Sequence, residues 1–274
     1  MTSSPAPTTP ATAAPAVEAR AVRVAYGSTV AVNDATLSLP RGAVTAIIGP
    51  NGSGKTTLLR AISGLQRPDA GSVAVLGRPA GQGRTDVAHV MQSTKVNDAV
   101  PLTVREVVRM GRYGLRGPLG RFRAEDAAAV DEAMARMEVV DLAARHLREL
   151  SGGQRQRVYV AQGLAQQADV LLLDEPITGL DLVSQDRIEQ VVAEERAAGR
   201  TVVLTTHDVD TAGAADHVVL MATHVVASGP PAEVLTAEHL SHAYGGRVFT
   251  TAEGTVVIAD PHHHGVGLTG HEHH

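Results

Sequence analysis

The chain has 274 residues but no cysteine and no tryptophan, and it contains only two phenylalanines and four tyrosines. Without cysteine it can form no disulfide bond, no thiolate zinc site and no cysteine nucleophile, which fits a reducing compartment. The scarcity of aromatics leaves valine, leucine, isoleucine and alanine to build the interior. Because 43% of the residues are apolar, a chain of this length can bury a core, and we expect a folded protein.

A basic excess and a long apolar run are missing as well. The 24 Lys and Arg residues are outnumbered by 29 Asp and Glu residues, which gives a net charge of −5. Proteins that coat nucleic acid usually carry a positive surplus, so we expect no nucleic-acid partner. No window approaches the roughly 20 continuous apolar residues of a membrane helix. We therefore expect any membrane contact to go through a partner.

The pattern along the chain changes near residue 21. A composition of mostly Ala, Pro, Ser and Thr up to about Val17 predicts a disordered leader over residues 1–20. From Ala21 on, short β-branched runs alternate with helical patterns, which predicts an α/β fold with a mainly parallel sheet covered on both faces. An Arg- and Gly-rich stretch over 111–123 is expected to be a connection between helices. Strands are expected at 22–26, 35–39, 44–48, 72–76, 87–91, 170–173 and 201–205, and helices from Lys55, between 103 and 149, up to about 166, and at 183–198.

The segment 49–56 reads GPNGSGKT and matches G-x-x-x-x-G-K-[ST] where an apolar strand pattern meets a helical one, the context that this motif requires. Glycines let successive backbone N–H groups converge on phosphate oxygens, and the helix N-terminus adds positive charge. Lys55 is expected to bridge the terminal phosphates, and Thr56 to offer its hydroxyl to Mg²⁺. The nucleotide-binding residues predicted here are Gly49, Pro50, Asn51, Gly52, Ser53, Gly54, Lys55, Thr56 and Thr57.

A second motif, VLLLDE at 170–175, is an apolar strand that ends in two carboxylates. In a parallel sheet its end lies at the same edge as the phosphate loop. Asp174 is expected to hold Mg²⁺, and Glu175 to act as the general base toward the attacking water, a role worth about 10²–10⁴ in rate. An acidic strand end by itself can also be a helix cap, so the prediction depends on the phosphate loop.

A third motif, LSGGQ at 150–154, directly precedes a helical pattern. One interpretation is a second anion-binding helix N-terminus, to which Ser151 supplies a hydroxyl while the glycines expose backbone N–H groups. The other is an ordinary serine cap followed by a flexible turn. The predicted contact residues are Ser151, Gly152, Gly153 and Gln154.

With this third motif, residues 21–244 resemble the ATP-binding subunits of ABC transporters, in which LSGGQ is the signature sequence. The resemblance implies a P-loop NTPase of the RecA-like type with a mainly parallel sheet. An N-terminal antiparallel β subdomain and an α-helical subdomain inserted at about 95–160 would complete it. Residues 245–274 would then form a C-terminal extension.

The resemblance also assigns roles to single residues. Tyr26 would stack on adenine, and Gln92 would be the glutamine that senses Mg²⁺ and the membrane partner. Asp181 matches the D-loop, and His207 matches the switch histidine near the γ-phosphate. Each of these residues alone could be a packing or surface residue, and the order in which they occur together supports the assignment.

The resemblance further implies ATP and Mg²⁺ as cofactors and a head-to-tail homodimer. Residues 151–154 of one copy would close over the ATP held by residues 49–57 of the other, so that positive dipoles face the γ-phosphate from both sides. Hydrolysis would reopen the dimer and drive transport. The implied partners are an integral membrane permease and an extracytoplasmic metal-binding protein, with this chain peripheral on the cytoplasmic face of the cell membrane.

Two further segments, PLTVREVVRMGRYG at 101–114 and YVAQGLAQ at 159–166, are similar to those of zinc and manganese importer ATPases. Siderophore and haem importer ATPases have a similar Gly-Arg-Tyr stretch and are the alternative. A soluble ABC ATPase acting on ribosomes or DNA ends is less well supported, because this chain has one cassette and a short helical insert. A non-hydrolysing regulator is disfavoured by the presence of both Glu175 and His207.

Six of the 13 histidines lie in the last 13 residues. Because neutral imidazole is a good Zn²⁺ ligand, one hypothesis is a tail that binds zinc loosely. The alternatives are a polar end without a role and a purification tag, although the stretch 265–270 interrupts the run. The residues concerned are His262, His263, His264, His271, His273 and His274.

Overall fold

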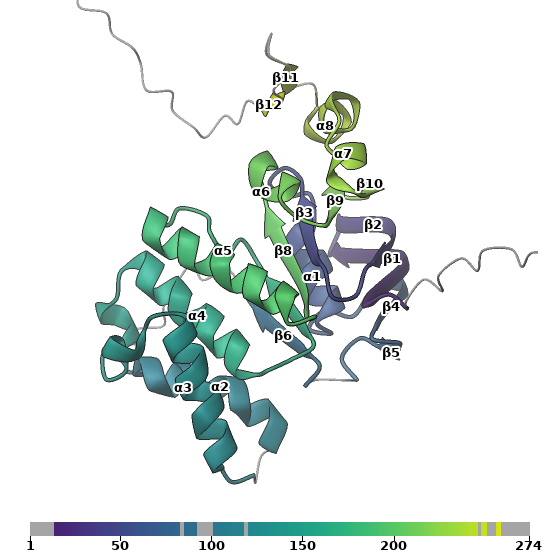
Figure 1. Ribbon diagram of the computed structural model, residues 1–274. Helices are drawn as coiled ribbons and strands as arrows, with labels where there is room; N and C mark the ends of the chain where they lie inside the picture. Colours follow the sequence, from purple (N-terminus) through teal and green to yellow (C-terminus); the bar gives the residue numbers. More distant parts are fainter. Residues whose placement is uncertain are drawn as a thin grey trace, which may run out of the picture.

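The computed structural model describes residues 14–82, 85–91, 101–117, 120–245, 248–250 and 256–258 (Figure 1). Most of the predicted leader, Gln92 and all six tail histidines lie outside these residues. The structure confirms the predicted α/β fold, with two main sheets and an inserted group of helices.

The central sheet has six strands in the order β10-β9-β3-β8-β7-β6. Five of them are parallel, and β10 pairs antiparallel with β9. Side chains alternate between two cores: Leu172 faces one, while Leu171 and Leu173 face the other. Burial on both faces explains the continuous apolar runs of these strands. Their bounds are β3 (Val44–Ile48), β6 (Val87–Val90), β7 (Val170–Leu173), β8 (Thr201–Thr206), β9 (His217–Met221) and β10 (Val225–Gly229).

An antiparallel sheet in the order β2-β1-β4-β5 and helix α1 cover one face of the central sheet. The leader prediction is wrong for residues 17–20, because the first strand begins at Val17 rather than at Val22. Val17 and Ala19 are fully buried, whereas the side chain of Arg20 in the same strand is exposed. This is the alternation of a half-buried strand. The elements are β1 (Val17–Tyr26), β2 (Thr29–Leu39), α1 (Lys55–Ile62), β4 (Ala70–Val75) and β5 (Arg78–Pro79).

The inserted helices and α5 lie on the other side of the central sheet (Figure 1). α2 begins with a capping box, in which the Thr103 hydroxyl accepts a hydrogen bond from the Glu106 N–H. The elements here are α2 (Val104–Arg116), α3 (Ala124–Arg136), the 3₁₀ turns η1 (Val140–Leu142) and η2 (Leu147–Glu149), α4 (Gly152–Ala165), α5 (Leu182–Ala197) and α6 (Val209–Gly213).

The connection expected over 111–123 is wrong for its first half, because α2 continues to Arg116. Gly111 is needed for close packing of two helices, since a Cβ there would collide with the carbonyl oxygen of Gln162 in α4. The next residue, Arg112, is buried and pairs with the fully buried Asp126 at 2.9 Å. A glycine that looks like a helix breaker therefore serves helix packing.

The chain beyond the central sheet continues with two short helices, α7 (Pro231–Val234) and α8 (Ala237–Tyr244), which pack on β9 and β10. The strands β11 (Val248–Thr250) and β12 (Val256–Ile258) form a separate pair. None of the helices that the structure describes combines the length and the apolar character needed to cross a bilayer.

Candidate active site

Three neighbouring strands of the central sheet end at one edge, and each leads into a predicted site residue. β3 ends at Ile48 and continues into the phosphate loop at 49–54. Ile48 pairs with Thr206 on β8, which directly precedes His207. On the other side of β8, β7 ends before Asp174. Parallel pairing thus assembles residues that are far apart in the sequence.

Gly49 and Gly54 show why the backbone of the phosphate loop needs glycine. A Cβ on Gly49 would lie 2.8 Å from the Ser53 hydroxyl and would also collide with the Met221 carbonyl oxygen. Gly54 has φ 94°, a conformation that residues with a side chain rarely adopt. It is followed by Lys55, the first residue of α1, so the loop carries the free N–H groups of a helix start.

A turn after β9 braces the phosphate loop, and sequence reasoning missed this contact. The Thr223 N–H donates to the Ser53 carbonyl oxygen at 3.0 Å, and the Asn33 N–H donates to the Thr223 carbonyl oxygen at 2.7 Å. Thr223 has φ 65°, which is unusual for a β-branched residue. No short-range pattern reveals this brace, because its partners are distant in the chain.

The amine of Lys55 lies inside the loop. Its Nζ donates to the carbonyl oxygens of Gly49 at 2.7 Å and Pro50 at 3.2 Å, and the residue is 5% exposed. Burial lowers the pKa of Lys55, and the nearby carboxylates of Glu175 and Asp174 act in the opposite direction. An anion entering the loop would give this amine a stronger partner than the two carbonyls.

Thr56, Asp174 and Thr205 form one hydrogen-bonded cluster. Asp174 Oδ1 accepts from the Thr56 hydroxyl at 3.1 Å and from the Thr205 hydroxyl at 2.7 Å. Thr205 also accepts from the Glu175 N–H at 2.8 Å. A hydroxyl and a carboxylate side by side are the hard oxygen ligands that Mg²⁺ prefers. The residues present therefore fit the predicted Mg²⁺.

Glu175 follows Asp174 with φ 47°, which departs from the extended path of β7. Strain of this kind is tolerated where the surroundings fix the backbone, and here the Thr205 bond to its N–H does so. Among the other predicted residues, Thr57 is buried in α1, His207 is half-buried, and Tyr26 is 47% exposed at the end of β1.

The LSGGQ segment begins α4, and its serine forms a complete capping box. The Gln154 N–H donates to the Ser151 hydroxyl at 3.2 Å, and the Ser151 N–H donates to Gln154 Oε1 at 3.1 Å. Gly153 lies against Asp181 and Ser184, where a Cβ would collide with both side chains. Hydrogen bonds from the Ser184 N–H and hydroxyl lower the pKa of Asp181.

The structure therefore brings the predicted residues together in two groups. Among the described residues, no hydrogen bond joins 151–154 to the phosphate loop at 49–57. One group contains the phosphate loop, Asp174 and Glu175. The other contains the LSGGQ segment and Asp181.

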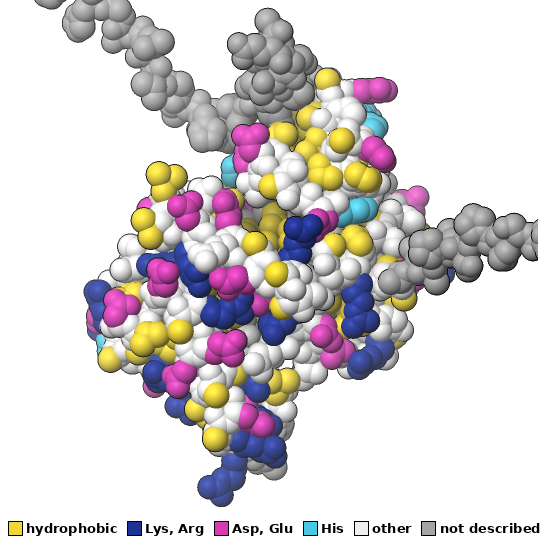
Figure 2. All heavy atoms as spheres, in the orientation of Figure 1, with side chains coloured by type: hydrophobic (Ala, Val, Ile, Leu, Met, Phe, Trp, Pro, Cys, Tyr) yellow, Lys and Arg dark blue, Asp and Glu magenta, His cyan; other side chains and the backbone are white. Residues whose placement is uncertain are grey.

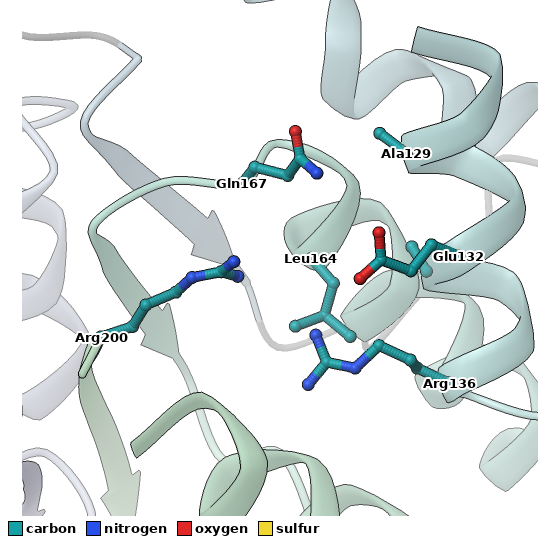
Figure 3. A pocket seen from close by; sticks show the side chains of 7 residues that line it. Ala129, Glu132, Arg136, Leu164, Gln167 and Arg200 are labelled. Carbon is teal, nitrogen blue, oxygen red and sulfur yellow. The ribbon is translucent and has the colours of Figure 1, made fainter. Parts of the chain in front are cut away.

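A small pocket at the opposite edge of the central sheet is lined by Glu132, Arg136 and Arg200, among others (Figure 3). The two arginines belong to an ion network. Arg200 directly precedes β8, and Glu195 binds it at 2.7 Å and binds Arg136 of α3 at 2.6 Å. The Glu195 side chain is 3% exposed. This network ties the inserted helices to the core and is separate from the phosphate loop.

Comparison with known proteins places these features in context. The sequence model of the ABC transporter family matches residues 32–178. The manganese transport system ATP-binding protein MntB of Bacillus subtilis is 37% identical over 233 residues, which cover 85% of this chain and 93% of that protein. The zinc transport system ATP-binding protein TroB of Treponema pallidum is 38% identical over 237 residues, which cover 86% and 89%.

Solved structures agree with the sequence comparisons. The dimeric structure of MJ0796, a bacterial ABC transporter cassette, is similar with a TM-score of 0.69 at 26% identity. The similarity covers 78% of this chain and 98% of that one.

Proposed function

The chain belongs to the ABC transporter family and is an ATPase whose hydrolysis is coupled to transport, and we propose that it powers import of a divalent metal ion. Zinc is the first candidate and manganese the second. The similarity to zinc and manganese transport proteins over most of their length supports this proposal. The observation that best supports ATP hydrolysis is the hydrogen-bonded cluster of Thr56, Asp174 and Thr205 beside the phosphate loop.

In the proposed mechanism the phosphate loop and Lys55 bind the terminal phosphates of ATP. The Lys55 amine exchanges its carbonyl partners for phosphate oxygens. Thr56 and Asp174 would hold Mg²⁺, which supplies positive charge to the phosphates when bound. Glu175 orients the attacking water and accepts its proton. His207, at the end of the adjacent strand, contacts the γ-phosphate from the side.

The remaining contacts to ATP come, in this proposal, from a second copy of the chain. Ser151, Gly153 and Gln154 lie with Asp181 rather than with the phosphate loop of the same chain. A head-to-tail dimer would bring these groups over the γ-phosphate and so complete the electrostatic stabilisation of the transition state. The dimeric structure of a similar cassette supports this arrangement. Tyr26 would stack on adenine, and Gln92 would transmit the state of the site to the permease.

The proposed partners are an integral membrane permease and an extracytoplasmic metal-binding protein, with this chain peripheral to the cytoplasmic face of the membrane. Siderophore or haem import is the alternative cargo class. The histidine-rich tail, if it binds zinc, favours zinc over a chelate, because imidazole is a ligand for the bare ion.

Uptake measurements test the cargo. A strain lacking this chain should take up less radioactive zinc or manganese than its parent, and the intact gene should restore uptake. Glu175→Gln should fail to restore it, whereas Glu189→Gln, which changes an exposed carboxylate on α5, should succeed. If uptake of both metal ions is unchanged while uptake of a ferric siderophore or haem falls, the metal-ion proposal is wrong.

A further inference from the structure

Two exposed histidines meet where α8 packs on the hairpin of β9 and β10. His224 lies in the turn between these strands, and His242 lies in the last turn of α8. Their ring centroids are 6.0 Å apart, with an angle of 62° between the ring planes. Figure 2 shows histidine side chains on the surface in this part of the molecule. The pair is outside the nucleotide site and has no part in the mechanism above.

The spacing of the two rings fits coordination of one ion. Bonds of about 2.0–2.1 Å from Zn²⁺ to imidazole nitrogens place two ligand rings about 5–6 Å apart between centroids. The two ring planes are also inclined to each other by 62° rather than stacked face to face. Imidazole suits divalent transition metals such as Zn²⁺ and is a poor ligand for Mg²⁺.

Protein side chains would fill only part of the coordination sphere of the bound ion, unlike in a structural zinc site. Among the described residues, no group of three or more His, Asp or Glu side chains is placed to hold a metal. Two imidazoles would therefore share the ion with water, whereas structural zinc sites have four protein ligands. Such a site exchanges its metal readily, as a sensor requires.

The turn that carries His224 is bonded to the phosphate loop. The Ala222 N–H donates to the His224 carbonyl oxygen at 2.9 Å, which closes the turn. Between these residues, Thr223 donates to Ser53 and accepts from Asn33. The proposed metal ligand His224 therefore directly follows the residue whose backbone is bonded to the nucleotide site. An ion that joins His224 to α8 would restrain this turn.

We propose that His224 and His242 bind a divalent transition metal ion, with Zn²⁺ as the best fit, and that the bound ion strengthens ATP binding. A restrained turn reduces the conformational entropy that the phosphate loop loses when it closes on ATP. By linkage, ATP must strengthen metal binding by the same factor. The proposal concerns binding to this chain and does not depend on which cargo the transporter carries.

The experiment uses the full chain with its tail histidines changed to alanine, so that the tail contributes no signal. Calorimetric titration with ZnCl₂, without nucleotide, should give one site per chain. His224→Ala and His242→Ala should each weaken zinc binding by about tenfold or more. His239→Ala is the matched control, because it removes an imidazole from the same helix, α8. The Nδ1 of His239 contacts the Val234 carbonyl oxygen and is not part of the proposed site. The tail positions changed throughout are His262, His263, His264, His271, His273 and His274.

A second measurement follows the affinity for a fluorescent ATP analogue with and without zinc. Zinc should raise the affinity for the analogue about fivefold or more in the His239→Ala control and leave it unchanged in His242→Ala. Because the nucleotide itself binds zinc equally in both variants, their comparison corrects for that effect. Absence of zinc binding, or binding that survives both substitutions, overturns the site. Zinc binding without a change in nucleotide affinity overturns the coupling. Neither outcome bears on the cargo, which the uptake assay tests separately.

Discussion

Thr205 donates its hydroxyl hydrogen to Asp174 Oδ1 at 2.7 Å, across two neighbouring strands of the central sheet. Both residues are buried, Asp174 at 2% exposure and Thr205 at 0%. The same hydroxyl oxygen accepts the Glu175 N–H. One threonine thus orients the carboxylate expected to bind Mg²⁺ and fixes the backbone of the expected general base.

Thr205→Val should lower the ATPase rate about tenfold to a hundredfold, because both carboxylates lose their alignment. It should also cost about 1–3 kcal/mol of unfolding free energy, since a buried carboxylate oxygen and a partly buried N–H lose a partner. Steady-state hydrolysis and denaturant unfolding measure the two effects.

Thr45→Val is the matched control. Thr45 is also fully buried in the central sheet, but its hydroxyl has no hydrogen-bond partner in the part of the chain that the structure describes. Removing it should change the stability by no more than about 0.5 kcal/mol. Equal effects of the two substitutions would contradict the positioning role of Thr205.

Glu175→Gln should bind ATP normally and hydrolyse it about 10²–10⁴ times more slowly, because an amide cannot accept the proton of water. ATP should then accumulate in the closed dimer, which light scattering after size-exclusion chromatography detects as a doubled mass. A variant that turns over ATP at the normal rate would contradict the assignment of the base. A variant that remains monomeric with ATP would contradict the two-chain site.

ATP affinity should fall with rising pH in the alkaline range. Burial lowers the pKa of Lys55 below 10.5 in the free protein, whereas bound phosphate stabilises the protonated amine and raises it. ATP therefore prefers the protonated form: full affinity holds below the pKa of the free protein and declines as the pH rises through it. Nucleotide titrations between about pH 7 and pH 10 test this. Constant affinity would contradict it, and in Lys55→Arg any remaining affinity should lack the decline.

Gly153→Ala should destabilise the fold by about 1–3 kcal/mol, because its methyl group would displace the capping pair of Asp181 and Ser184. Gly152→Ala is the control at the neighbouring position. Nothing lies within 4 Å of a Cβ at Gly152, so alanine should leave the stability unchanged or raise it by up to about 1 kcal/mol. Thermal unfolding compares them, and equal melting temperatures would rule out the packing argument.

The sequence predicted the features that depend on neighbouring residues. The strands at 44–48 and 170–173 and the helix that begins at Lys55 match the structure because contiguous residues determine them. Thr205 and Thr223 were missed as site supports, since their partners are brought together only by sheet formation. The start of β1 was missed because charged side chains on the exposed face hide the buried Val17 and Ala19.

The end of α2 was missed for a different reason. Gly111 looks like a helix terminator, and only the approach of α4 explains why it lies inside a helix. Local composition cannot reveal a contact with a distant helix.

The strand that leads into the phosphate loop, β3, has a hydrogen-bonded neighbour on each side. Backbone amides in such interior strands exchange with solvent only when the whole domain opens. On heating, ATPase activity and the central sheet should therefore be lost in the same cooperative transition. Hydrogen exchange should be slowest for the backbone amides of β3 and β8. The peripheral helices α7 and α8 can open at a lower free-energy cost than the central sheet. A conformational change in these helices can therefore affect the nucleotide site while the central sheet stays folded.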